Sequence, residues 1–227
     1  MNERRSCVNC SCMSTLFKQL RPEELEVMEN NRAEVTFKKG ETLIKHGTLA
    51  THVMYLKKGV VKNYAEDANR NMIITIDTSG DFIGVSNLFQ KDYFPYTVSA
   101  YTDTDVCMFD FNAFQNIASQ NARFAAEIIR LQSIMFNRIS ARMMCLTHRR
   151  LRGRMAHMLL CMERRIFKNG KVRNILNRRD FAEISQMSVE SVSRLLTEFK
   201  TDGLIVMEED GIRLVDYNKL KELSKKG

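Results

Sequence analysis

The sequence has few of the residues that mark linkers and membrane spans. It contains two prolines and no tryptophan, and no apolar run is long enough to cross a bilayer. The N-terminal segment MNERRSC lacks the apolar stretch of a secretory signal, which predicts a cytoplasmic protein with no membrane partner. In that compartment the six cysteines are expected to be thiols or metal ligands rather than disulfides.

The motifs of common enzymes are also missing. There is no glycine-rich phosphate loop, no H-E-x-x-H and no G-x-S-x-G, and the acidic pairs Glu23-Glu24 and Glu208-Glu209 stand in polar turns. The sequence therefore predicts a protein that is not an enzyme.

Positive charge is concentrated in the C-terminal part. Residues 1–140 hold 16 basic and 16 acidic residues, so the net charge of +8 arises entirely from residues 141–227. Residues 141–179 carry twelve Lys and Arg and one acid, Glu163. Such a region attracts a phosphate backbone through charge neutralisation and counterion release, which predicts double-stranded DNA as a partner.

Residues 188–199 have the period of an amphipathic helix. Apolar residues recur at steps of three and four, which predicts one buried face made of Val189, Val192, Leu195, Leu196 and Phe199. Ser188 precedes them as an N-cap. The opposite face is polar and carries Glu190, Ser191, Ser193, Arg194, Thr197 and Glu198.

The flanking segments give this helix a context. Asn177 is expected to cap a shorter helix that contains Asp180 and ends before the polar helix, and the two are separated by a tight turn. Residues 204–207 and 212–215 are expected to form two strands joined at Asp210-Gly211. This order is typical of a winged helix-turn-helix, whose second helix enters the major groove.

The N-terminal part consists of short β-type runs separated by glycines, which predicts an antiparallel β-roll. From 112 to 146 there is no glycine or proline, which predicts one long helix. Apolar residues recur along it at near-heptad spacing and predict the seam of a homodimer: Phe124, Ile128, Leu131, Met135, Ile139, Met143 and Leu146. The expected fold is α+β, with a segment and roll over 1–111, a dimerisation helix over 112–147 and a winged helix-turn-helix over 148–227.

Together these segments resemble the CRP/FNR superfamily of bacterial transcription regulators over nearly the whole chain. The resemblance rests on KKGETLIKHG, MYLKKGVVKNY and SGDFIGVSNLF in the roll and on DFAEISQMSVESVSRLLTEFKTDGLI near the C-terminus. It implies a roll similar to a cyclic-nucleotide-binding domain. One departure is Gln186, which stands where the family usually has the glycine of the helix-helix turn.

The most specific match is VESVSR, where Glu190, Ser193 and Arg194 correspond to the Glu-x-x-Ser-Arg with which the fumarate-nitrate regulator branch reads TTGA-type half-sites. The resemblance implies that Arg194 donates to guanine, that Glu190 accepts from a cytosine amine, and that Ser193 contacts a base edge or phosphate. Phosphate contacts are expected from five further residues: Ser188, Ser191, Arg152, Arg178 and Arg179.

The resemblance also suggests what the roll senses. Oxygen-sensing members bind a [4Fe-4S] cluster through three N-terminal cysteines and one in the roll, and the matching ligand set here is Cys7, Cys10, Cys12 and Cys107. The C-x2-C-x-C spacing is tighter than usual, so ordinary thiols, a zinc site or a thiol switch remain alternatives, as does an unknown small effector. Cyclic AMP is not expected, because Gly80-Asp81 replaces Gly-Glu and KDYFPYTVSA has no arginine for the phosphate.

The expected function is a homodimeric transcription regulator that reads a TTGA-type palindrome under allosteric control from the roll and contacts RNA polymerase, with residues 90–96 as a candidate contact loop. The alternative is an effector-binding module whose C-terminal helices dock a protein partner instead of DNA.

Overall fold

The computed structural model describes residues 13–66, 71–89, 93–167 and 171–226. The chain divides into two compact units, one made of residues 1–63 and 77–137 and the other of residues 64–76 and 138–227. The division falls inside strands β4 (Val60–Ala65) and β5 (Met72–Thr78) and inside helix α3 (Ala122–His148). Within the described ranges, no helix is both long and apolar enough to span a membrane.

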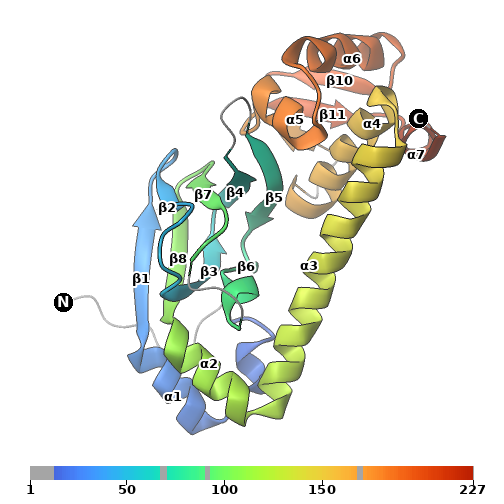
Figure 1. Cartoon of the computed structure of the whole chain (residues 1–227). Helices are drawn as coiled ribbons and strands as arrows, with labels where there is room; N and C mark the ends of the chain where they lie inside the picture. The colour runs from blue at the N-terminus through green and yellow to red at the C-terminus, as the bar shows by residue number, and fades with distance from the viewer. Residues whose placement is uncertain (1–12, 67–70, 90–92, 168–170, 227) are drawn as a thin grey trace. The chain divides into compact units, whose positions relative to one another are not determined.

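The first unit contains most of a β-roll built from two four-stranded sheets (Figure 1). One sheet has the order β1-β8-β3-β6, with bounds Arg32–Phe37, Thr104–Asp110, His52–Lys58 and Phe82–Ile83. The other has the order β2-β7-β4-β5, in which β2 is Thr42–Ile44 and β7 is Thr97–Ala100. Strand β8 pairs antiparallel with both β1 and β3. The predicted antiparallel roll is confirmed.

The core of this unit has two clusters, one between the two sheets and one between the β1-β8-β3-β6 sheet and the helices at one end of the roll. The helices are α1 (Pro22–Asn30), α2 (Phe111–Gln120) and the first turns of α3, with short 3-10 turns at Phe17–Gln19 and Val85–Asn87. The Phe114 ring packs on Phe124 with centroids 5.2 Å apart. Phe124 and Ile128, the first two residues of the expected dimer seam, are instead buried in this core.

The predicted single helix from residue 112 is in fact two helices, broken at Asn121. This residue has an extended backbone, and its side-chain oxygen accepts from the amides of Arg123 and Phe124 at 3.0 and 3.1 Å. Its amide group donates to Glu24 at 2.6 Å. Because Asn competes with the helical backbone for hydrogen bonds and favours caps, it ends α2 and begins α3 without any glycine or proline.

The second unit contains a helix-turn-helix followed by a β-wing. Its elements are α4 (Leu151–Met162), a π-helical turn (Glu163–Phe167), β9 (Lys171–Arg173), α5 (Arg178–Ser185), α6 (Val189–Thr201), β10 (Ile205–Glu208), β11 (Gly211–Leu214) and α7 (Tyr217–Lys226). The predicted hairpin is present, but its turn is Glu209-Asp210 rather than Asp210-Gly211, because Gly211 already pairs with Glu208 as the first residue of β11. Strand β9 adds a third antiparallel strand in the order β10-β11-β9. Helix α7, which the sequence did not suggest, packs on α4.

Candidate nucleic-acid interface and sensor residues

The turn between α5 and α6 is built by local hydrogen bonds. Asn177 caps α5 as predicted, because its side chain accepts from the Asp180 amide at 3.0 Å while Asp180 accepts from the Asn177 amide at 2.9 Å. At the other end Gln186 adopts a left-handed backbone with φ 52°. Its side-chain amide donates to the Glu183 carbonyl at 2.8 Å. The turn therefore forms without the expected glycine, at a strain of about 1–2 kcal/mol.

Helix α6 begins at Ser188, whose hydroxyl accepts from the Ser191 amide at 3.1 Å. Four of the five predicted apolar positions are buried: Val192, Leu195, Leu196 and Phe199. Val189 was expected on that face but is 40% exposed, because it occupies the first turn, where the helix emerges from the capping loop. Helix α6 thus has one buried face and one accessible face, which is called its front below.

The three residues expected to read bases lie on this front. Glu190 and Arg194 are exposed and Ser193 is half-buried, and their spacing of three and four places them on one face. Hydrogen bonds from its own backbone amide and from the Ser188 hydroxyl lower the pKa of Glu190. Its carboxylate is therefore an ionised acceptor at neutral pH, next to a guanidinium donor.

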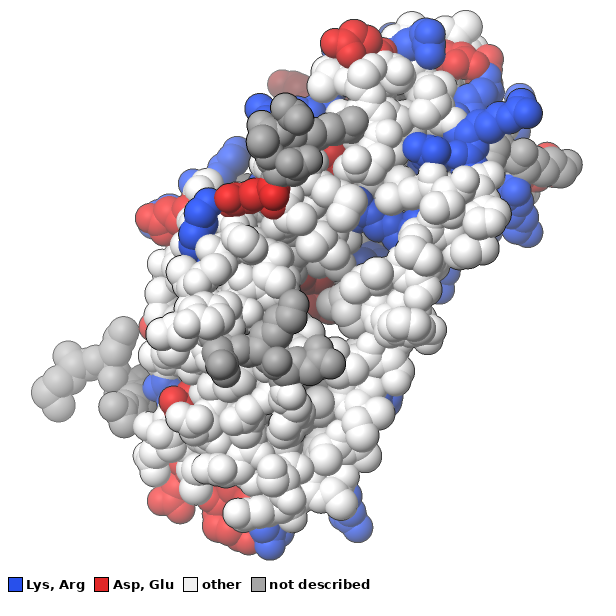
Figure 2. Space-filling view, viewed as in Figure 1, with Lys and Arg blue, Asp and Glu red and all other residues white. Residues whose placement is uncertain are grey.

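The residues expected to contact phosphate have differing surroundings. Arg178 is exposed. Arg179 pairs with Glu183 at 3.1 Å yet keeps three quarters of its side chain exposed. Ser188 and Ser191 are hydrogen-bonded to each other at 3.2 Å within the cap of α6. Figure 2 shows Lys and Arg side chains gathered on one side of this unit.

Arg152 has a different set of partners. Its guanidinium donates to Glu198 and, at 2.9 Å, to Asp202, and it lies 5.4 Å from the centroid of the Phe199 ring. All three partners belong to α6 or its C-cap, whereas Arg152 belongs to α4. The geometry favours a role in holding the recognition helix rather than a contact with phosphate.

The cysteine ligand set falls partly outside the described residues, since Cys7, Cys10 and Cys12 precede residue 13. Cys107 lies on β8 and is buried in the apolar core of the first unit. Within the described ranges, no three His, Cys, Asp or Glu side chains are grouped as a metal site would require.

The Gly80-Asp81 pair belongs to a closed turn. The Asp81 carboxylate accepts from the Thr78 amide at 3.0 Å, and the Gly80 amide donates to the Leu56 carbonyl at 2.9 Å. Elsewhere in the roll, the fully buried Asp77 accepts from Asn63 at 2.5 Å. The Asp81 carboxylate is thus engaged within its own turn, and the prediction against cyclic AMP stays a prediction.

A β-roll sensor joined to a winged helix-turn-helix defines a DNA-binding transcription regulator with an effector-binding domain. The family model for a cyclic nucleotide-binding domain matches residues 34–121, and that for a Crp-like helix-turn-helix domain matches residues 153–223. The chain belongs to the CRP/FNR family of transcription regulators, which are not enzymes.

Individual relatives are distant. The chain is 25% identical over 192 residues to the transcriptional activator protein anr of Pseudomonas aeruginosa, covering 82% of this chain and 78% of that one. It is 21% identical over 225 residues to the fumarate and nitrate reduction regulatory protein of Escherichia coli, covering 96% and 90%. The structure of FixK2 from Bradyrhizobium japonicum is similar with a TM-score of 0.77 and 23% identity, covering 85% of this chain and 96% of that one.

Proposed function

We propose that the protein is a homodimer that reads a palindrome with TTGA-type half-sites. The observation that carries this proposal is the exposed pair of Glu190 and Arg194 on a helix whose other face is buried. A guanidinium matches the two acceptors of guanine in the major groove, and an ionised carboxylate accepts from the amine of cytosine. Ser193 lies between them and can contact either a base edge or a phosphate.

The exposed face of α3 supports the dimer. Ile129, Phe136 and Met143 are 65%, 69% and 62% exposed and follow one another at seven-residue steps. A groove of about 840 Å³ runs beside this face in the first unit, where Phe89 is 64% exposed. A stripe of large apolar side chains at heptad spacing is typical of a helix that packs against a second copy of itself.

The dimer is tested by sedimentation of Phe136→Glu, which we expect to be monomeric and to lose tight binding to a palindrome. Arg123→Glu is the matched control, since Arg123 lies well around α3 from Phe136 and is also exposed. If Phe136→Glu sediments like the wild type, the two chains associate through another surface.

The DNA proposal is tested by titrating a TTGA-containing palindrome at fixed salt. Arg194→Ala should cost about 1–3 kcal/mol and abolish the preference for guanine at the position it reads. Arg178→Ala should instead weaken all sequences alike. If neither substitution alters binding to duplex DNA, the C-terminal helices dock a protein partner, which is the competing function.

We further propose that the signal is sensed through Cys7, Cys10, Cys12 and Cys107, which would hold an iron-sulfur cluster. The apolar cluster that contains Cys107 also contains Leu16 and Phe17, and Met13 packs against it. Cys12 immediately precedes Met13 in the sequence. When bound, the cluster would supply a group that responds to oxidants.

The sensor is tested by assaying iron and acid-labile sulfide in protein purified without oxygen. Cys107→Ser should lose both, whereas Cys161→Ser, a cysteine of the other unit, should retain them. An iron-free wild type would point to a small effector in the roll and leave the N-terminal cysteines as thiols.

As an activator, the protein would also contact RNA polymerase, for which the exposed Tyr93 is a candidate.

A further inference from the structure

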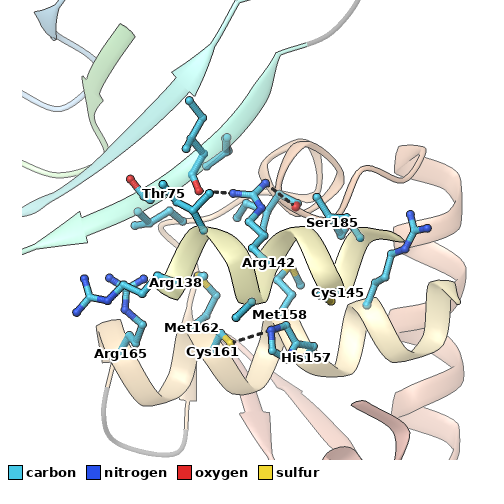
Figure 3. A pocket seen from close by; sticks show the side chains of 18 residues that line it. Thr75, Arg138, Arg142, Cys145, His157, Met158, Cys161, Met162, Arg165 and Ser185 are labelled. Atoms are coloured by element: carbon cyan, nitrogen blue, oxygen red, sulfur yellow. Dashed lines mark hydrogen bonds between the residues drawn. The ribbon is translucent and has the colours of Figure 1, made fainter. Parts of the chain in front are cut away.

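A second cavity lies wholly within the unit that contains the recognition helix. It has a volume of about 200 Å³ and is lined by residues of β5, α3, α4, the π-helical turn and α5 (Figure 3). An engineered cavity on the order of 150 Å³ holds benzene, so this one accommodates a single ring or a short branched chain with one polar group. It is too small for a nucleotide.

The described lining of the cavity is rich in arginine. No Asp or Glu is among these lining residues, and four of them are arginines: Arg138, Arg142, Arg154 and Arg165. In Figure 3, Arg138 and Arg165 extend toward the same end of the cavity. A cation held away from water by apolar walls is unfavourable, and a ligand anion that enters the cavity would relieve that cost.

Arg142 of α3 reaches backbone carbonyls of two other elements that line the cavity. It donates to the carbonyl of Ile74 and, at 2.8 Å, to the carbonyl of Ile184. Neither acceptor carries a charge. Burial lowers the pKa of Arg142 to about 10, so the side chain is still a cation at neutral pH. Its planar guanidinium matches a carboxylate in two-point geometry.

The remaining walls are largely apolar and select against small inorganic anions. They are formed by isoleucine, leucine and methionine side chains together with two cysteines, including Ile73, Ile139, Leu146, Met158, Met162 and Cys145. An apolar pocket with a few convergent polar groups is the usual form of a small-molecule site. A ligand that satisfies both parts has a compact hydrocarbon body and one anionic head.

We propose that this cavity binds a small organic carboxylate with an aromatic or branched aliphatic body, and that its occupancy acts on the recognition helix through Arg142. The Ile184 carbonyl belongs to the last turn of α5, two residues before the left-handed Gln186. A carboxylate on Arg142 would compete with that carbonyl for the same guanidinium. The ligand would therefore alter the turn that places α6, independently of any event at the cysteines.

The test is isothermal titration of the full-length protein at fixed salt with benzoate, 3-methylbutanoate and hexanoate, and with benzamide as the uncharged analogue of benzoate. We expect benzoate or 3-methylbutanoate to bind saturably at one site per chain and more tightly than the unbranched hexanoate. Benzamide should bind about tenfold more weakly than benzoate, because hydrogen bonds to a charged group are the stronger ones. If neither benzoate nor 3-methylbutanoate binds, if hexanoate binds as tightly, or if inorganic phosphate competes as well as benzoate, the proposal is wrong.

Variants locate the site. Arg142→Gln removes the proposed carboxylate partner but also the bond to Ile184, so Arg165→Gln provides the variant that leaves the Arg142 bonds in place. Arg165→Gln should weaken carboxylate binding about tenfold, whereas the exposed neighbour Arg164, which does not line the cavity, should tolerate the same change. Equal losses in both variants would indicate general charge attraction and overturn the assignment.

A DNA titration with and without benzoate separates the two parts of the proposal. A shift in DNA affinity that Arg165→Gln abolishes supports the coupling through α5. Saturable binding with no shift would retain the site and exclude the coupling. Carboxylate binding in a protein that binds no DNA would leave the site intact while overturning the proposed function.

Discussion

Replacing Arg152 by alanine should loosen the recognition helix without removing a contact to DNA. The side chain joins α4 to Glu198 and Asp202 at the end of α6 and covers one face of the Phe199 ring. Because Arg152 contacts these three side chains, we expect its loss to lower the stability of the second unit. If Arg152 instead contacted phosphate, its loss would mainly lower DNA affinity.

The expected loss of stability depends on how exposed the paired side chains are. The three charged side chains are 36–38% exposed, so each ion pair is screened by solvent and contributes on the order of 0.5 kcal/mol. The contact of the guanidinium with the aromatic ring adds about 0.5–1 kcal/mol. We therefore expect a loss of about 1–2 kcal/mol, which shrinks as salt is raised.

Hydrogen exchange of the α6 amides measures this loss, and 1–2 kcal/mol corresponds to a decrease in protection of roughly 5- to 30-fold. The dependence of DNA affinity on salt provides the second measurement. Loss of one phosphate contact lowers the slope by about one. We expect that decrease for the exposed Arg178→Ala and not for Arg152→Ala. A lower slope with unchanged exchange in Arg152→Ala would refute the structural role.

Three further predictions concern the fold. Gln186→Gly should be more stable than Gln186→Ala by about 1 kcal/mol in chemical denaturation, since only glycine relieves the left-handed backbone. Gly59→Ala should destabilise the roll by more than about 2 kcal/mol, because the new carbon would lie 2.4 Å from the Thr104 hydroxyl, whereas Gly40→Ala meets no atom within 4 Å and should lose less. Burial would raise the pKa of Glu24, but hydrogen bonds from Arg21 and Asn121 lower it overall. The Glu24 carboxylate therefore stabilises the fold at neutral pH, and this contribution is lost as the pH falls below about 4.5 and through the lowered pKa. Glu24→Gln should be less stable than the wild type at neutral pH, and the difference should vanish in acid.

The periodic parts of the fold could be predicted from the sequence. The apolar steps of α6, the cap at Asn177 and the β10-β11 hairpin each depend on residues close together in the chain. Local hydrogen bonds and one buried face determine such elements, so their prediction needed no knowledge of the rest of the molecule.

The parts that depend on distant partners could not be predicted. Arg152 looks like any other residue of a basic run until Glu198 and Asp202, some 46 and 50 residues later, are brought beside it. The break at Asn121 depends likewise on Glu24, far away in the sequence. The cavity around Arg142 is formed by four separate segments, and nothing in their spacing indicates that they meet.

The exposed face of α6 carries two side chains of opposite charge. Glu190 and Arg194 add no net charge, whereas the excess of basic residues lies in the segment before α5. In the proposed complex, choice among duplexes belongs to α6, whereas much of the attraction to any duplex comes from basic residues outside it. Exchanging a few side chains of α6 should redirect the protein to a new operator while its speed of search along the chromosome stays the same.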